Sequence, residues 1–362
     1  MNIASRLDRL ATIDGADFLL ILRLEDIRWL TGFTGGTAQL LIQRSTRHAR
    51  LFVDGRYLER AQHEVQKSGA DVEVVLAGSR DGIDGLIASA VHGNEVAVDL
   101  EHLTAARHND LSKKMTVVAQ PTSLDALRRV KDEWEIDLMA RAAAIADLAL
   151  QSVVADGICG KTEKQVRNRL DSVMRDNGAD DVGFDTIVAT GPNGARPHHE
   201  PTNDVIESGH GVVIDFGAEL DGYRSDMTRT IKVGEWSAEY QRMYDVVKEA
   251  QITGVRAVTA GVVGSQIDAA VRAVFAREGL EHEYVHGTGH GIGLYIHEEP
   301  IFSPRCSAVL DLNEVVTVEP GLYRGGVGGV RIEDQVVVTG TECRILTLSP
   351  KELSCPRSPQ TI

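Results

Sequence analysis

Short apolar runs that alternate with polar, helix-like stretches predict a mixed α/β region in the first third of the chain. The predicted elements are a helix at residues 5–11 and strands at 17–22, 38–43, 50–54, 72–76 and 95–99. The pattern becomes polar and proline-containing over 119–129, and a long amphipathic pattern begins near Lys131. We therefore predict an N-terminal domain at 1–125, a second domain at 126–349 and an irregular tail at 350–362.

The second domain shows one order of elements twice. The predicted elements are helices at 132–154 and 162–178 with strands at 184–189, 211–217 and 222–233, and then helices at 237–260 and 265–279 with strands at 315–319 and 330–339. The second helix of each set opens on a capping-box pattern, Thr162-x-x-Gln165 and Ser265-x-x-Asp268. The offset of about 105 residues predicts two related halves around a pseudo-twofold axis.

Charge and composition narrow the class of function. The chain has 362 residues, and 38 Lys and Arg against 53 Asp and Glu give a net charge of −15. That balance speaks against a nucleic-acid or anionic-membrane partner, which needs clustered positive charge. The longest early apolar run, residues 18–22, is far shorter than the ~20 residues of a membrane span, so we expect no membrane segment.

The cysteines predict a reducing compartment. Cys159, Cys306, Cys343 and Cys355 are scattered and form no C-x-x-C pair, so they indicate neither a disulfide framework nor a thiolate zinc site. We expect reduced thiols and a cytoplasmic protein.

Paired carboxylates are the first chemical signal. Asp221-Gly222 indicates a hairpin, and a loop at residues 220–221 would make Asp215 and Asp226 direct cross-strand neighbours. Glu319 and Glu333 follow 104 and 107 residues later, each in a β-rich run. Two acid pairs on a shared axis predict an oxygen-rich site for two divalent cations. The alternative is a register one residue off, which would send the two aspartates to opposite faces.

Histidines supply the other ligand type. HGTGHGIGLYIHE holds His286, His290 and His297, and GARPHHEP holds His198. The glycines argue against a helix, and the run is neither H-E-x-x-H nor G-x-G-x-x-G. Each histidine alone could be an ordinary core or surface residue, but the cluster beside two acid pairs favours a metal site. No G-x-S-x-G, P-loop or Cys–His signature supports nucleophilic serine or cysteine chemistry.

Four strings, IDFGAELDGYRSDMTRT, HGTGHGIGLYIHE, TVEPGLY and GGVRIED, resemble the "pita-bread" metallopeptidases. That superfamily includes methionine aminopeptidase, aminopeptidase P and Xaa-Pro dipeptidase (prolidase). IRWLTGFTGG, DGRY and LRRVKDEWEI resemble the Xaa-Pro branch, which carries an extra N-terminal domain. The resemblance implies an α+β fold, in which a pita-bread catalytic domain with pseudo-twofold helix-helix-strand halves follows a smaller, mixed α/β creatinase-like domain.

The resemblance also implies roles for individual residues. The implied metal ligands are Asp215, Asp226, His290, Glu319 and Glu333, with Asp226 and Glu333 bridging two metals. The implied neighbouring or substrate-contacting residues are His198, His286, His297 and Arg331. The doublet His198-His199 departs from the Pro-His-Gly of some prolidases, so either histidine could face the site.

The expected reaction is hydrolysis of an Xaa-Pro bond by a hydroxide shared between two metals. Glu319 is the expected proton carrier, and His286 and His297 are expected to hydrogen-bond the reacting groups. Arg331, two residues from Glu333 and on the same strand face, is expected to orient that carboxylate. Mn²⁺ is the expected metal, with Co, Fe or Zn as alternatives.

Several functional alternatives stay open at this point. A dipeptidase is favoured over an aminopeptidase P that acts on longer peptides, and short proline-containing peptides are the expected partners. Another C–N hydrolase on the same scaffold, as in creatinase, is a further hypothesis. Creatinase works without the metal set, so the five ligands count against a creatinase-like mechanism, and a metal-dependent amidase stays open. A metal-free peptide-binding module belongs to a different class, and retention of all five ligands argues against it. The resemblance also implies a homodimer.

Overall fold

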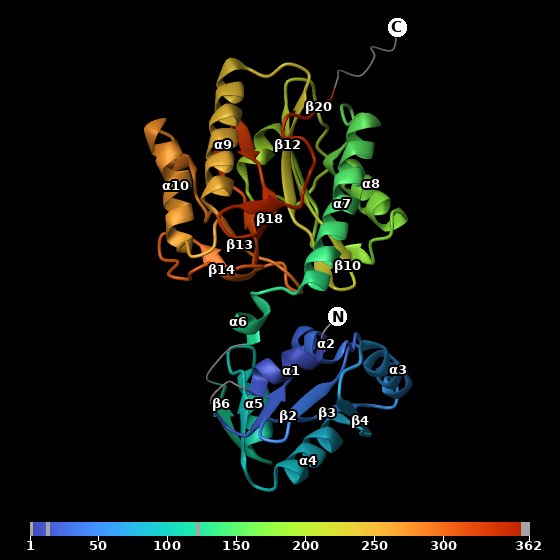
Figure 1. The fold of residues 1–362 in the computed structure, drawn as a ribbon. Coiled ribbons are helices and arrows are strands. Elements are labelled where there is room, and N and C mark those ends of the chain that lie inside the picture. The colour runs from blue at the N-terminus through green and yellow to red at the C-terminus, as the bar shows by residue number, and fades with distance from the viewer. Residues whose placement is uncertain (1–2, 12–14, 121–123, 356–362) are drawn as a thin grey trace. The chain divides into compact units, whose positions relative to one another are not determined.

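The computed structural model describes residues 3–11, 15–120 and 124–355. The chain divides into two compact units, Met1–Leu127 and Arg128–Ile362, each of which is described by itself (Figure 1). Both units combine helices with sheets, as the pattern of apolar residues predicts.

The first unit is built on one six-stranded sheet of order β4-β3-β2-β1-β5-β6. Its strands are β1 Phe18–Ile21, β2 Gln39–Gln43, β3 His48–Val53, β4 Val72–Leu76, β5 Glu95–Val98 and β6 Thr116–Ala119. Its helices are α1 Ile3–Ala11, α2 Leu24–Thr31, α3 Leu58–Ser68, α4 Arg80–Val91 and α5 Ala105–Ser112, and α6 Leu124–Arg128 lies at the boundary. The five predicted strands are confirmed, whereas β6 lies in a stretch where no strand is predicted.

In the described part of the second unit, four helices of 14 to 23 residues frame the sheets (Figure 1). They are α7 Glu133–Ala155, α8 Glu163–Asp176, α9 Ala238–Ala257 and α10 Gly264–Arg277. The capping box at Thr162 and Gln165 is confirmed, because each side chain bonds the other residue's backbone N–H. The capping box predicted at Ser265 and Asp268 is wrong. Val263 precedes α10, its N–H donates to Gln266 Oε1 at 3.1 Å, and Asp268 is buried inside the helix.

The strands of the second unit form several small sheets rather than one. A four-stranded sheet has the order β20-β12-β9-β8, and a five-stranded sheet has the order β14-β13-β15-β18-β19. The strands of these two sheets are β8 Ile187–Thr190, β9 Gly211–Phe216, β12 Met227–Val233 and β20 Ser354–Cys355, with β13 Gly289–Gly291, β14 Glu298–Phe302, β15 Val315–Val318, β18 Asp334–Val338 and β19 Cys343–Ile345. Smaller sheets are made by β7 Asp181–Val182, β10 Ala218–Leu220 and β11 Tyr223–Arg224, and by β16 Gly321–Arg324 and β17 Gly328–Arg331. Helix, helix and strands recur in the predicted order.

The helices are held by apolar cores. Small and aliphatic residues of α7 and α8, such as Ala146, Leu150 and Leu170, pack in one cluster with Ile214 of β9 and Ile231 of β12. α7 is also long and apolar enough to cross a membrane by length and composition, with a mean hydropathy of 1.5 in its best window. Half of that window is buried inside the protein. The core helix of a soluble protein passes the same test, so the expected absence of a membrane partner stays a prediction.

Part of the predicted irregular tail has a defined place. β20 pairs with β12 in parallel, with Ser354 opposite Lys232. Upstream of β20, the carbonyl of Ser349 accepts from the buried Arg229, and Lys351 Nζ lies 2.5 Å from Asp334 Oδ2. Ser354 and Cys355 therefore form a strand where the prediction has an irregular tail, residues 350–353 are irregular as predicted, and residues 356–362 lie outside the described residues.

Candidate metal centre

The hairpin of the first half places Asp215 and Asp226. The turn consists of Asp221 and Gly222, whose φ angles are 47° and 76°, because a type I′ turn needs positive φ at both central residues. Leu220 therefore pairs with Tyr223, and Thr228 rather than Asp226 lies opposite Asp215. The predicted direct pairing of the two aspartates is wrong by two residues. Because two is an even step, both aspartates still face one cavity.

The second half contributes three further groups. His290 lies in β13, Glu319 directly follows β15, and Glu333 lies between β17 and β18. Glycine is required in β13, because a Cβ on Gly289 would lie 2.0 Å from the carbonyl oxygen of Thr317. This close approach explains the glycine-rich run around His290 without a phosphate-binding loop.

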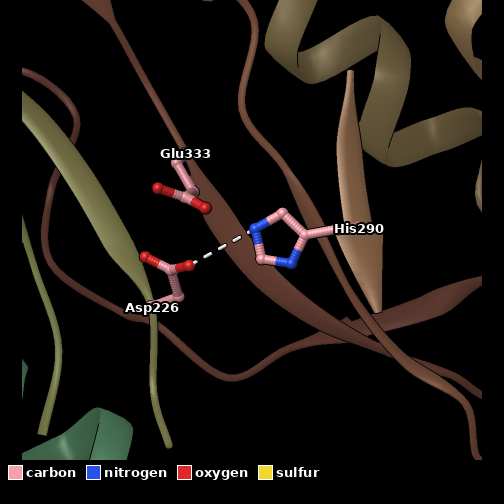
Figure 2. Close-up of side chains that lie close together, drawn as sticks. All are labelled: Asp226, His290 and Glu333. Carbon is pink, nitrogen blue, oxygen red and sulfur yellow. Dashed lines mark ion pairs between the residues drawn. The ribbon is translucent and has the colours of Figure 1, made fainter. Parts of the chain in front are cut away.

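These side chains converge in the structure. Ligand atoms of Asp226, His290 and Glu333 lie within 4.8 Å of one another, and Figure 2 shows the three side chains pointing toward one another. His290 Nε2 is 3.6 Å from Asp226 Oδ2 and 3.4 Å from Glu319 Oε1. Asp215 lines the same cavity. All five predicted ligands are thus brought together from segments about a hundred residues apart.

The donor set fits divalent cations. Among the described residues, the buried Asp215 Oδ1 and Glu333 Oε1 have no hydrogen-bond partner. His290 Nδ1 lies 2.9 Å from the Gly291 carbonyl, to which it donates, so Nε2 keeps its lone pair for a ligand. Buried oxygens without a donor are costly, and a cation is the partner that removes this cost.

The pKa directions agree with this interpretation. Burial raises the pKa of Asp226 well above its ordinary value, and the neighbouring Glu333 and Asp215 raise it further. The pKa of Glu333 is raised by burial and then by Glu319 and Asp215. Burial also raises the pKa of Glu319, to about 7. Without a cation, these carboxylates repel one another in a low-dielectric site.

Arg331 has a different partner from the predicted one. Its Nη2 donates to Asp215 Oδ2 at 2.6 Å, and its Nε donates to the Thr228 hydroxyl at 3.1 Å. That hydroxyl in turn donates to Glu333 Oε2 at 2.7 Å. Arg331 ends β17 before Glu333 is reached, so the two residues do not share one strand. Arg331 therefore reaches Glu333, the carboxylate it is predicted to orient, only through Thr228.

His286 uses both ring nitrogens inside the protein. Nδ1 donates to the Gly287 carbonyl at 2.7 Å, and Nε2 lies 2.8 Å from the Tyr323 hydroxyl, from which it accepts. Tyr323 also accepts from Arg331 Nη1 at 2.9 Å. Burial lowers the pKa of His286 to about 4, so the ring is neutral at pH 7. The sequence predicts a hydrogen bond from His286 to the reacting groups. In the structure both ring nitrogens bond protein groups instead, so neither is available to a substrate.

The other histidines divide between the cavity and the core. His198 and His297 line the cavity, and the rings of His297 and His290 meet edge to face with centroids 4.6 Å apart. Burial lowers the pKa of His297. His199 is buried elsewhere, with Nε2 2.8 Å from Glu163 Oε2. Of the doublet, His198 therefore faces the candidate centre.

The cavity has a volume of about 360 Å³. One part of its wall carries the acids and histidines, and the rest is apolar, formed by Phe184, Ile187, Ile296 and Ile301. Ile301 is 41% exposed. A polar reacting end beside an apolar wall is typical of a small-ligand site.

Sequence reasoning missed several residues of the centre. Thr228 and Tyr323 link Arg331 to Glu333 and to His286, and the apolar wall was not predicted. Thr228 carries a usable signal, because it follows Asp226 by two residues and shares its face. Tyr323 offers none, since its contacts join segments that are distant in the chain.

The comparisons with known proteins agree with this geometry. Residues 137–340 match metallopeptidase family M24, and residues 4–130 match the creatinase/prolidase N-terminal domain. The uncharacterized peptidase YqhT of Bacillus subtilis is 37% identical over 344 residues, which cover 94% of this chain and 96% of that protein.

Two solved structures extend the likeness to the fold. A structure of Xaa-Pro dipeptidase from Bacillus anthracis has a TM-score of 0.90 and 36% identity, and it covers 98% of both chains. A structure of X-Pro aminopeptidase from Thermotoga maritima has a TM-score of 0.87 and 34% identity, and it covers 96% of this chain and 99% of that one.

Proposed function

Because the chain belongs to metallopeptidase family M24, with a creatinase/prolidase N-terminal domain before a pita-bread domain, we propose that it hydrolyses the Xaa-Pro bond of dipeptides or short peptides. One observation carries this proposal. Five ligand side chains converge on a cavity where two buried carboxylate oxygens have no protein partner among the described residues. Such a site suits a metal-dependent hydrolase.

The proposal includes two divalent cations. Asp215, Asp226, His290, Glu319 and Glu333 would hold them, with Asp226 and Glu333 shared between the two. When bound, the cations would lower the pKa of a shared water to give the attacking hydroxide and polarise the scissile carbonyl. Four of the five ligands are carboxylates, which favours Mn²⁺, with Co, Fe or Zn as alternatives.

The remaining steps belong to the side chains around the cavity. Glu319, 3.4 Å from His290 Nε2, would take a proton from the attacking water and pass it to the leaving nitrogen. His297 and His198 line the cavity and would hydrogen-bond the carbonyl as it becomes tetrahedral. His286 and Arg331 would act indirectly, by holding Tyr323 and Asp215 in place.

A second candidate, an aminopeptidase for longer Xaa-Pro peptides, is favoured by the charge of the cavity. In an Xaa-Pro dipeptide, proline is the C-terminal residue and carries a free α-carboxylate. A site that binds this carboxylate needs a cation or several hydrogen-bond donors. Among the described residues that line the cavity, Arg331 is the only arginine or lysine. Its guanidinium already donates to Asp215, Thr228, Tyr323 and the Pro197 carbonyl. A peptide that continues past proline brings no carboxylate to this point.

The experiment is hydrolysis of Ala-Pro and Ala-Pro-Ala by Mn²⁺-reconstituted protein, with Ala-Ala as the control. Cleavage of Ala-Pro alone would establish the dipeptidase, and preference for Ala-Pro-Ala would establish the aminopeptidase. Failure to cleave either proline peptide, with bound metal confirmed by elemental analysis, would overturn the proposed substrate and leave the family unchanged.

Two further properties belong to the same proposal. We expect a homodimer, which light scattering would test, and a monomer would contradict it. We also expect a cytoplasmic protein, because the four cysteines are scattered in the sequence and form no C-x-x-C pair, which favours a reducing compartment. Fractionation of cells that express the chain would test this location.

A further inference from the structure

Glu163, the first residue of α8, is a fully buried carboxylate outside the metal centre. Five hydrogen bonds converge on it from residues 190–202, which are the last residue of β8 and the loop that follows. They come from the Thr190 N–H at 2.8 Å, the Asn193 side-chain amide at 2.9 Å, His199 Nε2 at 2.8 Å, and the N–H and hydroxyl of Thr202 at 2.8 Å each. Both oxygens of the carboxylate are therefore saturated by residues 190–202.

The same loop delivers His198 to the cavity. His198 and Pro197 line the cavity, while His199, the next residue, points the other way toward Glu163. The opposite side of the loop is held as well. The Pro197 carbonyl accepts from Arg331 Nη1 at 3.3 Å, and Gly194 lies so close to Gly329 that a Cβ on Gly329 would be 1.9 Å from the Gly194 carbonyl oxygen. The loop is thus fixed between α8 and β17.

The negative charge of Glu163 lets both of its oxygens accept hydrogen bonds from residues 190–202. Burial alone would raise the pKa of Glu163, but hydrogen bonds from Thr190, His199 and Asn193 lower it overall. A glutamine at this position would keep one accepting oxygen and turn an N–H₂ group toward the donors on the other side. At least two buried donors would then lose their acceptor, which favours rearrangement of the loop.

We propose that Glu163 is a positioning residue for the reaction, which sets the place of His198 in the cavity through His199 and the backbone of residues 190–202. The proposal rests on the proposed function, in which His198 contacts the substrate. The competing interpretation is that Glu163 only joins α8 to residues 190–202 and so stabilises the fold. The two interpretations differ in whether a change at Glu163 acts through His198.

A double-mutant cycle separates them. Glu163→Gln should lower kcat/KM by about 10- to 100-fold, because misplacement of about 1 Å can cost that much. In a His198→Ala background, Glu163→Gln should have almost no further effect on kcat/KM, since the group it positions is gone. Val166→Ala, in the apolar core one turn along α8, is the control for lost stability and should leave kcat/KM within about twofold.

A second readout does not depend on activity. In histidine-labelled, metal-free protein, the His198 ring resonance, assigned with His198→Ala, should shift or broaden in Glu163→Gln and stay unchanged in Val166→Ala. If Glu163→Gln does not fold, Thr202→Val removes one of the five hydrogen bonds and should give a smaller change of the same kind.

The outcomes are distinct. Independent, multiplicative losses in the double mutant with an unmoved His198 resonance would overturn the positioning role and leave the peptidase proposal intact. If His198→Ala alone retained full activity, the contact of His198 with substrate would be wrong instead. If the wild-type protein hydrolysed neither proline peptide, the proposed function would fail, while the resonance test of His198 would still stand.

Discussion

Glu333 and Asp334 are neighbours in the chain and both are buried, yet their charges are balanced in opposite ways. Asp334 Oδ1 is 2.7 Å from Arg229 Nη2, and its Oδ2 is 2.5 Å from Lys351 Nζ. Further donors to Asp334 are Gln251 and Thr347. Glu333 receives one hydrogen bond from Thr228, and its other oxygen has no protein partner among the described residues.

The difference separates a structural charge from a functional one. Both residues are at most 1% exposed, so burial does not distinguish them. The protein supplies the counter-charge for Asp334 through Arg229 and Lys351. The ion pair with Lys351 also links β18 to the tail. The protein supplies almost none for Glu333, so a cation or a proton from solution would have to balance that carboxylate. Uncompensated burial therefore marks the metal centre better than burial itself.

The largest expected effect comes from removing an uncompensated acid. Glu333→Ala or Asp226→Ala should lower turnover by more than about 10³-fold, because several kcal/mol of cation-dependent charge stabilisation are lost. The metal-free protein should unfold at an unchanged or higher urea concentration, since a repelling charge has gone. Near wild-type turnover in both variants would rule out the ligand assignment.

Removing the compensated acid should act on stability instead. Asp334→Ala leaves Arg229, which is 0% exposed, without its carboxylate, so the free energy of unfolding should fall by about 3–5 kcal/mol. Urea denaturation of the metal-free protein measures this, with Glu333→Ala as the neighbouring control. A loss below about 1 kcal/mol would show that the ion pair contributes little.

Metal addition should stabilise the wild-type protein and distinguish the two acids again. Mn²⁺ at a hundredfold excess over its Kd should add about 2.7 kcal/mol to the free energy of unfolding. Glu333→Ala should lose most of this increase, whereas a folded Asp334→Asn should retain it. Thermal unfolding before and after chelation gives the values. An equal increase in Glu333→Ala would contradict the proposed site.

The smallest expected effect concerns His286. This buried ring avoids an unbalanced charge by staying neutral, whereas Asp334 is charged and balanced by cationic partners. The folded pKa of His286, about 4, lies below the ~6.5 of an unfolded histidine, so the unfolded chain binds more protons between these values. This histidine should therefore make the metal-free protein less stable as the pH falls from 6.5 to 4. His286→Gln should show a shallower decline over that range, measured by urea denaturation. Identical slopes would contradict the depressed pKa.

Much of the centre could be predicted from local pattern. Asp215, Asp226, Glu319 and Glu333 stand in apolar β-runs, and the two halves repeat one order of elements. The approximate strands and the two acid pairs follow from such signals, whereas the choice of His290 among the four candidate histidines follows only from the resemblance to the pita-bread metallopeptidases. The turn chemistry of Asp221-Gly222 was also readable, but the register was placed two residues off because the turn was assigned to residues 220–221.

The contacts that orient the centre could not be predicted. Arg331 bonds Asp215 across 116 positions of the chain, and Thr228 reaches Glu333 across 105. Such pairs depend on how separate sheets pack against each other. The alternation of apolar and polar residues along one strand does not predict that packing. The resemblance implies a contact between His286 and the reacting groups, whereas the bond from its actual partner Tyr323, 37 residues away, has no signal in the local sequence.

The contacts of Arg229 with the C-terminal part of the chain have a consequence for folding during synthesis. Arg229 is buried, and its partners Asp334 and Ser349 and the neighbouring Lys351 are made up to 122 residues later. At ~5–20 residues per second, that interval lasts roughly 6–24 s on the ribosome. During this interval Arg229 lacks the carboxylate of Asp334, and the edge of β12 that later pairs with β20 has no partner strand. Nascent chains stopped before Lys351 should accordingly bind chaperones more than the full-length chain does.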